Sequence, residues 1–264
     1  MLRANWEKNA HSQLTYPNFH AIMLSGIENQ MMGYGYTEED SHMRTKLRDR
    51  VMPVYTKGEE IFNMTSHIVG AAIGVAALVL CIVLSAVHRN GYGLAGSIVY
   101  GVSMIVLYTM SSVYHGLRDG MAKRVMQVLD HCTIYLLIAG TYTPILLSAM
   151  RPIDPVSSWV LLGVVWGLSA VAITLTAIDL KKYSVFSMIC YIAMGWCILV
   201  RVPLLIEAVG WGGFWLILLG GVSYTIGAVL YGMGRKRKYM HSVFHLFVVL
   251  GSVLHLLAIL FFAL

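Results

Sequence analysis

Charged side chains are scarce in this sequence, at 12% of its 264 residues. Soluble globular domains carry about 25%, so this composition argues against an ordinary water-soluble protein. Hydrophobic residues make up 58% instead, which predicts a chain whose solvent is lipid. The net charge of +6 does not indicate a nucleic-acid partner. The basic residues lie in short stretches between apolar runs, a pattern that orients membrane proteins.

Cysteine is also sparse. The chain has four cysteines, each inside an apolar run and none in a CxxC pair. This usage excludes a disulfide framework and a zinc knuckle. It predicts reduced cysteines that pack in the interior.

The beginning of the chain has no apolar run long enough for the core of a signal peptide. We expect residues 1–57 to be a cytoplasmic polar segment, partly disordered, ahead of a membrane domain at residues 58–264. The mixed-charge stretch at 38–50 is predicted to be helical or disordered. A natural translation start at Met52 is the alternative, and it would make the first 51 residues an extension of little functional weight.

Seven apolar runs are each long enough to cross a bilayer, whose hydrocarbon core of about 30 Å needs about 20 helical residues. They cover residues 61–87, 92–116, 125–150, 156–178, 183–206, 210–233 and 241–264. Lipid offers no partner to unpaired backbone groups, so we expect each run to be helical throughout. The predicted fold is an all-α integral membrane protein, a seven-transmembrane helix bundle. Two GxxxG pairs, at 70–74 and 163–167, are expected to pack helices within the chain.

Basic residues between the runs are unevenly distributed. Nine lie in one set of connections: Arg118, Lys123, Arg124, Lys181, Lys182, Arg235, Lys236, Arg237 and Lys238. Only two, Arg89 and Arg151, lie in the other set. The positive side of a membrane protein is the cytoplasmic one. We therefore expect the N-terminus in the cytoplasm and Leu264 outside, with the protein in the plasma membrane.

Several polar and ionisable residues lie inside the predicted spans, where each is costly and needs a reason. With the topology above they share one depth, near the cytoplasmic boundary: His67, Ser111, His115, Asp130, His241 and His245. The sequence separates them widely, but the membrane brings them into one layer. This coincidence is the strongest functional signal in the chain.

His241 and His245 are spaced i, i+4, which places both imidazoles on one face of a helix about 6 Å apart. A third nitrogen from His115 would leave one coordination position open for water, the pattern of catalytic zinc. Asp130 would then orient or deprotonate that water. Imidazole also suits copper, iron and nickel, so zinc is an inference from ligand type.

Three other histidines receive different interpretations. His67 is expected to support the ligands by contacts to neighbouring helices rather than to bind the metal. His131 adjoins Asp130 but is rotated from it by about 100° on a helix, so we expect it to pack or to face the interface. His255 lies about 21 Å along the helix from His241, too deep to reach the metal, and is predicted to be a core histidine.

Three motifs give the chain a family resemblance. They are Glu60-Ile-Phe-Asn63-Met-Thr-Ser-His67, Ser111-Ser-Val-Tyr-His115 with Asp130 after it, and His241-Ser-Val-Phe-His245. Together they resemble the hemolysin III family, the bacterial branch of the progestin and adipoQ receptor family, across residues 54–264. Residues 1–50 match nothing in that family.

The resemblance implies Zn²⁺ held by His115, His241 and His245, with Asp130 reaching the metal through water and Ser111 beside the site. We therefore expect Asp130 and Ser111 to be the catalytic residues. Three residues of the first motif are expected to support the site from behind the ligands: Glu60, Asn63 and His67. Relatives include receptors with ceramidase-like activity, but this chain has no recognisable N-terminal receptor domain.

Three functions compete at this point. The first is a zinc-dependent intramembrane hydrolase of lipid amide or ester bonds, with membrane lipids as substrate or ligand. The second is a cytolytic protein, as the family name suggests. Polar residues gathered at one end rather than along a full-depth path argue against a pore. The third is a sensor of membrane state in which zinc is structural.

Overall fold

The computed structural model describes residues 46–234 and 237–264, and every regular element in these ranges is helical. The longer helices are α2 (Lys57–Val87), α3 (Gly91–Gly116), α4 (Met121–Pro144), α5 (Pro155–Ile178), α6 (Ser184–Trp196), α7 (Val202–Gly234) and α8 (Met240–Ala258). Two short segments are 3-10 helices, η2 (Leu47–Asp49) and η4 (Cys197–Arg201), and two are π-helices, η3 (Ile145–Met150) and η5 (Ile259–Ala263). The all-α prediction is confirmed for the described residues.

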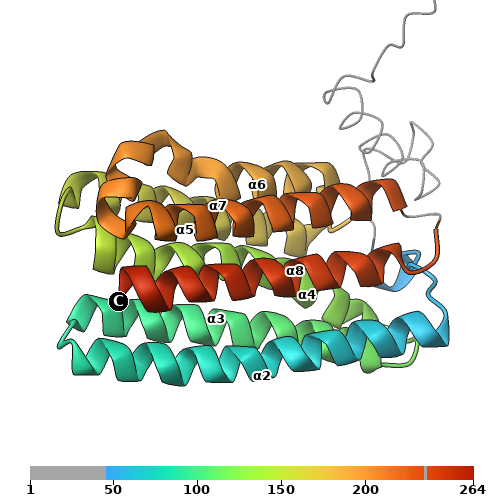
Figure 1. Ribbon diagram of the computed structural model, residues 1–264. Helices are drawn as coiled ribbons and strands as arrows, with labels where there is room; N and C mark the ends of the chain where they lie inside the picture. Colours follow the sequence, from blue (N-terminus) through green and yellow to red (C-terminus); the bar gives the residue numbers. More distant parts are fainter. Residues whose placement is uncertain (1–45, 235–236) are drawn as a thin grey trace, which may run out of the picture.

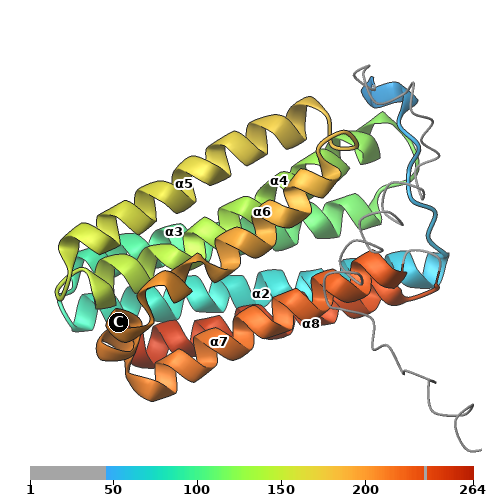
Figure 2. The same cartoon turned by 90° about the horizontal axis from the view of Figure 1, so that it is seen from above.

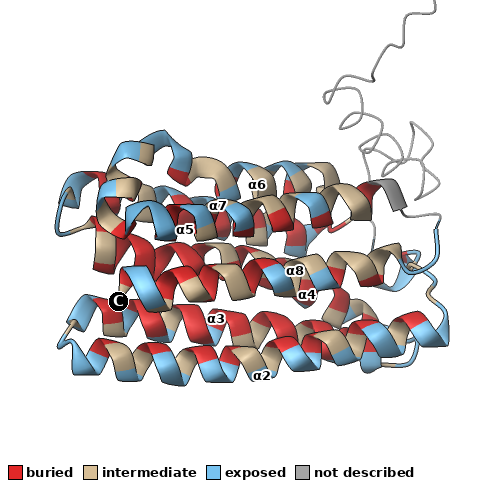
Figure 3. Ribbon diagram, in the orientation of Figure 1, coloured by how far each residue is buried: buried red, intermediate tan, exposed pale blue. Residues whose placement is uncertain are grey.

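The long helices form one bundle with roughly parallel axes (Figures 1 and 2). α2 packs on α3, α3 on α4 and α4 on α5, while α7 packs on α8 and α8 packs on α2. Figure 3 shows buried residues on α3 and α4 and exposed residues along the outer face of α2. The first and last helices of the bundle are therefore neighbours, and the start of α8 lies beside the start of α2. All four cysteines are free, as predicted.

Six helices among the described residues are long and apolar enough to cross a membrane. Four of them match predicted spans one to four, and the sixth matches span seven. The fifth, Ser184–Gly232, contains 49 residues and covers predicted spans five and six together. A straight helix of that length would extend about 74 Å, well beyond a bilayer.

The chain reverses direction within this long apolar stretch. η4 follows α6, and the first turns of α7 end at Gly210, whose backbone is non-helical at φ 64° and ψ 175°. A positive φ is adopted readily by glycine because it lacks a Cβ atom. Figure 2 shows α6 and most of α7 running as separate limbs on either side of this bend.

The predicted runs are helical over nearly all of their length, as expected, but η3 and η5 are π-helices and η4 is a 3-10 helix. Pro144 ends α4 and has no N–H to donate, so the regular helix ladder is interrupted there. The next six residues form a π-helix, in which the Arg151 N–H bonds to the Leu146 carbonyl at 2.9 Å. A Cβ on Gly96 would lie 2.7 Å from the Cα of Pro144, so α3 packs closely against this irregular segment.

The two GxxxG pairs behave differently. A Cβ on Gly70 would lie 2.6 Å from the ring of Tyr108, and one on Gly74 would lie 3.1 Å from the backbone of Ile105. This pair lets α2 approach α3, as predicted. Gly163 and Gly167 have no atoms within 4 Å of the corresponding position. Packing of this second pair within the described chain is therefore ruled out, because α5 presents it on an open face.

Residues 46–56 cross the end of the bundle before α2 begins (Figure 2), and we call them the strap. The Arg124 guanidinium donates to the Arg50 carbonyl, and the Arg50 side chain lies 4.0 Å from the Asp179 carboxylate. These contacts join the strap to the α4 and α5 ends. Of the predicted N-terminal segment, residues 1–45 lie outside the described residues, as do Arg235 and Lys236 of the third basic connection.

Candidate metal centre

Three histidines from two helices converge at the end of the bundle beside the strap. His115 lies on the last turn of α3, while His241 and His245 lie on the first turns of α8. One ring nitrogen from each residue lies within 4.8 Å of the others. His115 and His245 are buried, with 3% and 1% exposure, and His241 is half-buried. This group could hold a metal ion.

The distances between the nitrogens fit a common ion. The Nε2 atom of His241 lies 3.2 Å from that of His115 and 3.0 Å from that of His245. Two nitrogen ligands of a tetrahedral Zn²⁺ lie about 3.3 Å apart, given Zn–N distances of about 2.0–2.1 Å. Hydrogen bonds among the three histidines cannot pair both close contacts of His241, because each Nε2 offers either one proton or one lone pair. Three neutral imidazoles around a cation would be compatible with the arrangement.

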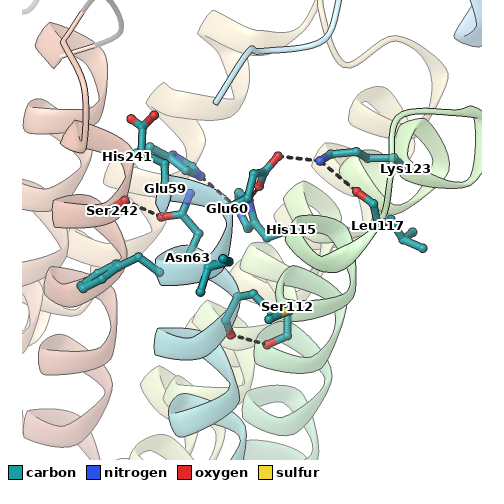
Figure 4. Close-up of polar contacts among 12 residues, drawn as sticks. Glu59, Glu60, Asn63, Ser112, His115, Leu117, Lys123, His241 and Ser242 are labelled. Atoms are coloured by element: carbon teal, nitrogen blue, oxygen red, sulfur yellow. Dashed lines mark hydrogen bonds and ion pairs between the residues drawn. The ribbon is translucent and has the colours of Figure 1, made fainter. Parts of the chain in front are cut away.

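The carboxylate of Glu60, on the first turn of α2, orients His115 (Figure 4). Oε2 of Glu60 lies 2.6 Å from Nδ1 of His115. A carboxylate accepts, so Nδ1 carries the proton and Nε2 is left with a lone pair facing the other histidines. Hydrogen bonds of this kind, donated by metal-binding histidines to carboxylates, fix the tautomer and the ring orientation.

Lys123 in turn holds Glu60. Its Nζ donates to the other oxygen of Glu60 at 2.5 Å and to the Leu117 carbonyl at 3.1 Å. Lys123 is only 5% exposed, although the sequence places it in a basic loop. It lies on the first turn of α4, so it fixes α2 and α4 relative to the ligand on α3.

Two further contacts fix the start of α8 against α2. Asn63 is fully buried, and its Oδ1 accepts a hydrogen bond of 2.6 Å from Ser242, which lies between the two histidines of α8. Glu59 accepts the backbone N–H of Tyr239 at 2.6 Å, just before α8 begins. The same Glu59 closes a capping box with Thr56 at the start of α2. The depth of the HxxxH pair is therefore set by side chains of the first helix.

Two aromatic rings cover the histidines. His67 stacks on His245 with 3.7 Å between ring centroids and an angle of 16°. Neither ring nitrogen of His67 has a hydrogen-bond partner among the described residues, so its contact with His245 is made through the face of the ring. From the other side, Tyr55 of the strap stacks on His241 with 4.9 Å between centroids.

An elongated cavity of about 170 Å³ begins at the histidines and continues into the bundle. His67, Ser111, Asp130, His241 and His245 line this end of it. Asp130 is 9% exposed, and the hydroxyl of Ser111 is buried without a partner among the described residues. The rest of the wall is mostly apolar, from α3, α4, α6, α7 and α8.

Comparison with known proteins agrees with the three motifs. The family described as "Haemolysin-III related" matches residues 55–256, which include the whole centre. The chain belongs to the haemolysin-III related family. Hemolysin-3 of Bacillus cereus is 37% identical over 206 residues, covering 78% of this chain and 92% of that protein. The Hemolysin-3 homolog of Bacillus subtilis is 32% identical over 209 residues, or 79% and 96% of the two chains. The human monocyte to macrophage differentiation factor is more distant, at 25% identity over 168 residues, or 61% and 67%.

Two further histidines of this haemolysin-III related chain, His131 and His255, line the cavity. His131 lines the cavity, and its Nδ1 lies 3.7 Å from an oxygen of Asp130 and 2.8 Å from the Gln127 carbonyl. We expected His131 to pack or to face the interface, because it is rotated by about 100° from Asp130. Its side chain instead lines the same cavity as Asp130. His255 is buried far from the centre, as predicted, but it lines the opposite end of the same cavity.

Sequence reasoning missed three residues of this haemolysin-III site: Tyr55, Glu59 and Lys123. The T-x-x-E pattern at 56–59 signals a helix start, but nothing in it indicates a bond to Tyr239. Lys123 was counted only as a charge that orients the chain. Tyr55 lies before the first predicted span, where no periodicity or spacing connects it to α8.

Proposed function

We propose that this protein is a zinc-dependent intramembrane hydrolase of lipid amide or ester bonds. The observation that carries the proposal is a three-histidine centre at the end of an elongated, largely apolar cavity. Three nitrogen ligands leave a coordination position open, as in catalytic zinc sites. An apolar cavity beside that position suits the hydrocarbon chain of a lipid whose polar group reaches the histidines.

When bound, Zn²⁺ would polarise the carbonyl oxygen and lower the pKa of a water molecule. Asp130, on the cavity wall, would accept a proton from that water and return it to the leaving amine or alcohol. The Ser111 hydroxyl would donate to the oxygen on which negative charge develops. Glu60 would hold His115 in one tautomer throughout.

The topology remains part of the proposal. We propose seven crossings, because the two limbs on either side of Gly210 are each suited to one crossing in opposite directions. The charge bias of the loops then supports a cytoplasmic N-terminus and places the histidines at the inner leaflet of the plasma membrane. Lipids of that leaflet would be the substrates.

The test is turnover by the purified full-length protein, reconstituted and loaded with Zn²⁺, against a panel of lipid amides and esters. We expect turnover that a chelator abolishes and Zn²⁺ restores. His245→Ala should lose both the metal and the activity, whereas His88→Ala, at the other end of the bundle, should keep both. Equal turnover by the wild type and His245→Ala would end the proposal.

Membrane lysis is a second candidate, since the relatives of Bacillus cereus and Bacillus subtilis carry the name hemolysin. The site favours it less. The cavity wall is mostly apolar along its length, whereas ion-conducting paths are built around rings of backbone carbonyls or charged side chains. Conductance of the purified protein in planar bilayers distinguishes the two functions, because stable channels support lysis and their absence supports the hydrolase.

A further inference from the structure

The end of the cavity far from the metal centre carries polar side chains, Thr141, Tyr142 and His255, in an otherwise apolar wall. A second cavity of about 30 Å³ adjoins it. Six residues line both cavities and mark this far end: Thr141, Tyr142, Gly195, Trp196, Gly221 and His255. A cavity that held only a hydrocarbon chain would need no polar group at such a depth.

Two helices place these groups at one level. His255 follows His245 by ten positions on α8, which corresponds to about 15 Å along the axis. Thr141 follows Asp130 by eleven positions on α4, or about 16 Å. The cavity therefore has two polar ends about 15 Å apart, joined by an apolar wall.

The hydrogen bonds of His255 identify its free atom. Its Nε2 lies 3.0 Å from the Ile217 carbonyl, which can only accept, so the proton is on Nε2. Nδ1 is then an acceptor, and it is buried without a partner among the described residues. A Cβ on Gly220 would lie 2.4 Å from the ring, so only glycine there leaves room for the imidazole against α7.

At the same level, the Thr141 hydroxyl can only accept a further hydrogen bond, and the Tyr142 hydroxyl already donates one and accepts one. Thr141 donates to the Leu137 carbonyl at 2.8 Å, which leaves only oxygen lone pairs. Tyr142 donates to the Gly195 carbonyl at 2.9 Å and accepts the Ile198 N–H at 3.2 Å. The remaining capacity of Thr141 and His255 is therefore to accept a hydrogen bond. A buried acceptor left unpaired is costly.

We propose that the far end of the cavity binds a hydroxyl group on the hydrocarbon chain of the lipid. The hydroxyl would lie about 15 Å from the polar group held at the histidines, and it would donate to His255 Nδ1 or Thr141 Oγ1. A carbonyl at the same position on the chain would meet acceptors only. The proposal rests on the proposed function in one respect, that the cavity takes a lipid chain, and it names hydroxylated chains as the preferred class.

Binding, rather than turnover, tests the proposal. Affinities of the purified full-length protein are measured for stearate, for hydroxystearates with the hydroxyl at successive positions, and for ketostearates with the carbonyl at the same positions. We expect one region of the chain where the hydroxyl tightens binding about tenfold over stearate, as one buried hydrogen bond allows. The ketostearate with its carbonyl at the same position should bind no more tightly than stearate.

Two variants locate the effect. Whichever of Thr141→Val, which preserves the volume, and His255→Leu removes the acceptor should lose the preference for the hydroxystearate, while both variants bind stearate as the wild type does. Thr141→Ser, which keeps the hydroxyl, should retain it. Equal affinity for hydroxystearates and stearate would overturn this inference and leave the hydrolase proposal standing. An equal gain with the ketostearate, or a preference that survives in both Thr141→Val and His255→Leu, would also overturn it. Failure of every chain to bind would overturn it together with the assignment of the cavity to a lipid chain.

Discussion

Glu60 and His115 form a carboxylate–imidazole pair at 2.6 Å that directs the free nitrogen of His115 toward His241. The pair joins the first turn of α2 to the last turn of α3. It also gives the half-buried Glu60, at the start of the first span, two charge-compatible partners, His115 and Lys123. Glu60 has no histidine neighbour in the sequence, and its role emerges only from the packing of the two helices.

Replacing Glu60 with Gln should weaken metal binding by about 10- to 100-fold, the usual effect of losing a hydrogen-bonding partner behind a ligand. The amide cannot reproduce a charged acceptor for both His115 and Lys123. Competition with a metal-sensitive dye measures the affinity. Glu59→Gln is the matched control, because Glu59 bonds to Tyr239 and Thr56. It should lower thermal stability more than zinc affinity, and an equal loss of affinity in both variants would contradict the role given to Glu60.

Asp130→Asn should keep the metal and lower turnover by at least about 100-fold, the typical contribution of a general acid or base. Asp130 lines the cavity but belongs to none of the three ligand positions. Elemental analysis of the variant should therefore show normal metal content, while the same preparation shows the loss of hydrolysis. If the metal is purely structural, as a membrane sensor requires, the variant would retain full function, and the catalytic assignment would fail.

Tyr55→Ala should speed the extraction of metal by a chelator several-fold, because the Tyr55 ring stacks on His241 and shields it on the strap side. Tyr55→Phe keeps the ring and should behave as the wild type. The rate is followed by the loss of bound metal after mixing with an excess of chelator. Identical rates for Ala and Phe would mean that the metal leaves by another route.

Gly70→Ala should lower the free energy of unfolding by about 1–3 kcal/mol, the usual range for overpacking a tight contact. The added methyl would lie 2.6 Å from Tyr108, whose ring is fully buried and whose hydroxyl is fixed to Ser252 at 2.7 Å. Gly163→Ala, on the open face of α5, should be close to neutral. Unfolding in mixed detergent micelles compares the two, and equal destabilisation would mean that the α5 face is packed against a partner.

The sequence was informative where chemistry follows from depth and helical spacing. His241 and His245 could be paired because a helix repeats nearly every four residues, and His115 could be added because the membrane restricts it to the same layer. Glu59, Lys123 and Tyr55 could not be assigned, since their contacts depend on which helices become neighbours. No local pattern records that α8 packs beside α2.

For the fold, the sequence predicted the helical segments but not the irregularities inside them. Hydropathy located the apolar segments, and the predicted boundary between spans five and six, at 206–210, coincides with the non-helical Gly210. It gave no sign of the π-helix after Pro144, because every residue from Ile145 to Met150 is compatible with an ordinary helix. Interior irregularities of this kind arise from backbone hydrogen bonding rather than from the apolar pattern.

Because the ligands come from α3 and α8, the centre cannot exist on a partly synthesised chain. The ribosome must release the last helix before His241 and His245 can reach His115 and the first-helix groups that hold them. Loading of the proposed metal would thus be a late event in biogenesis, and a product truncated before α8 would lack two of the three ligands however well its earlier helices insert.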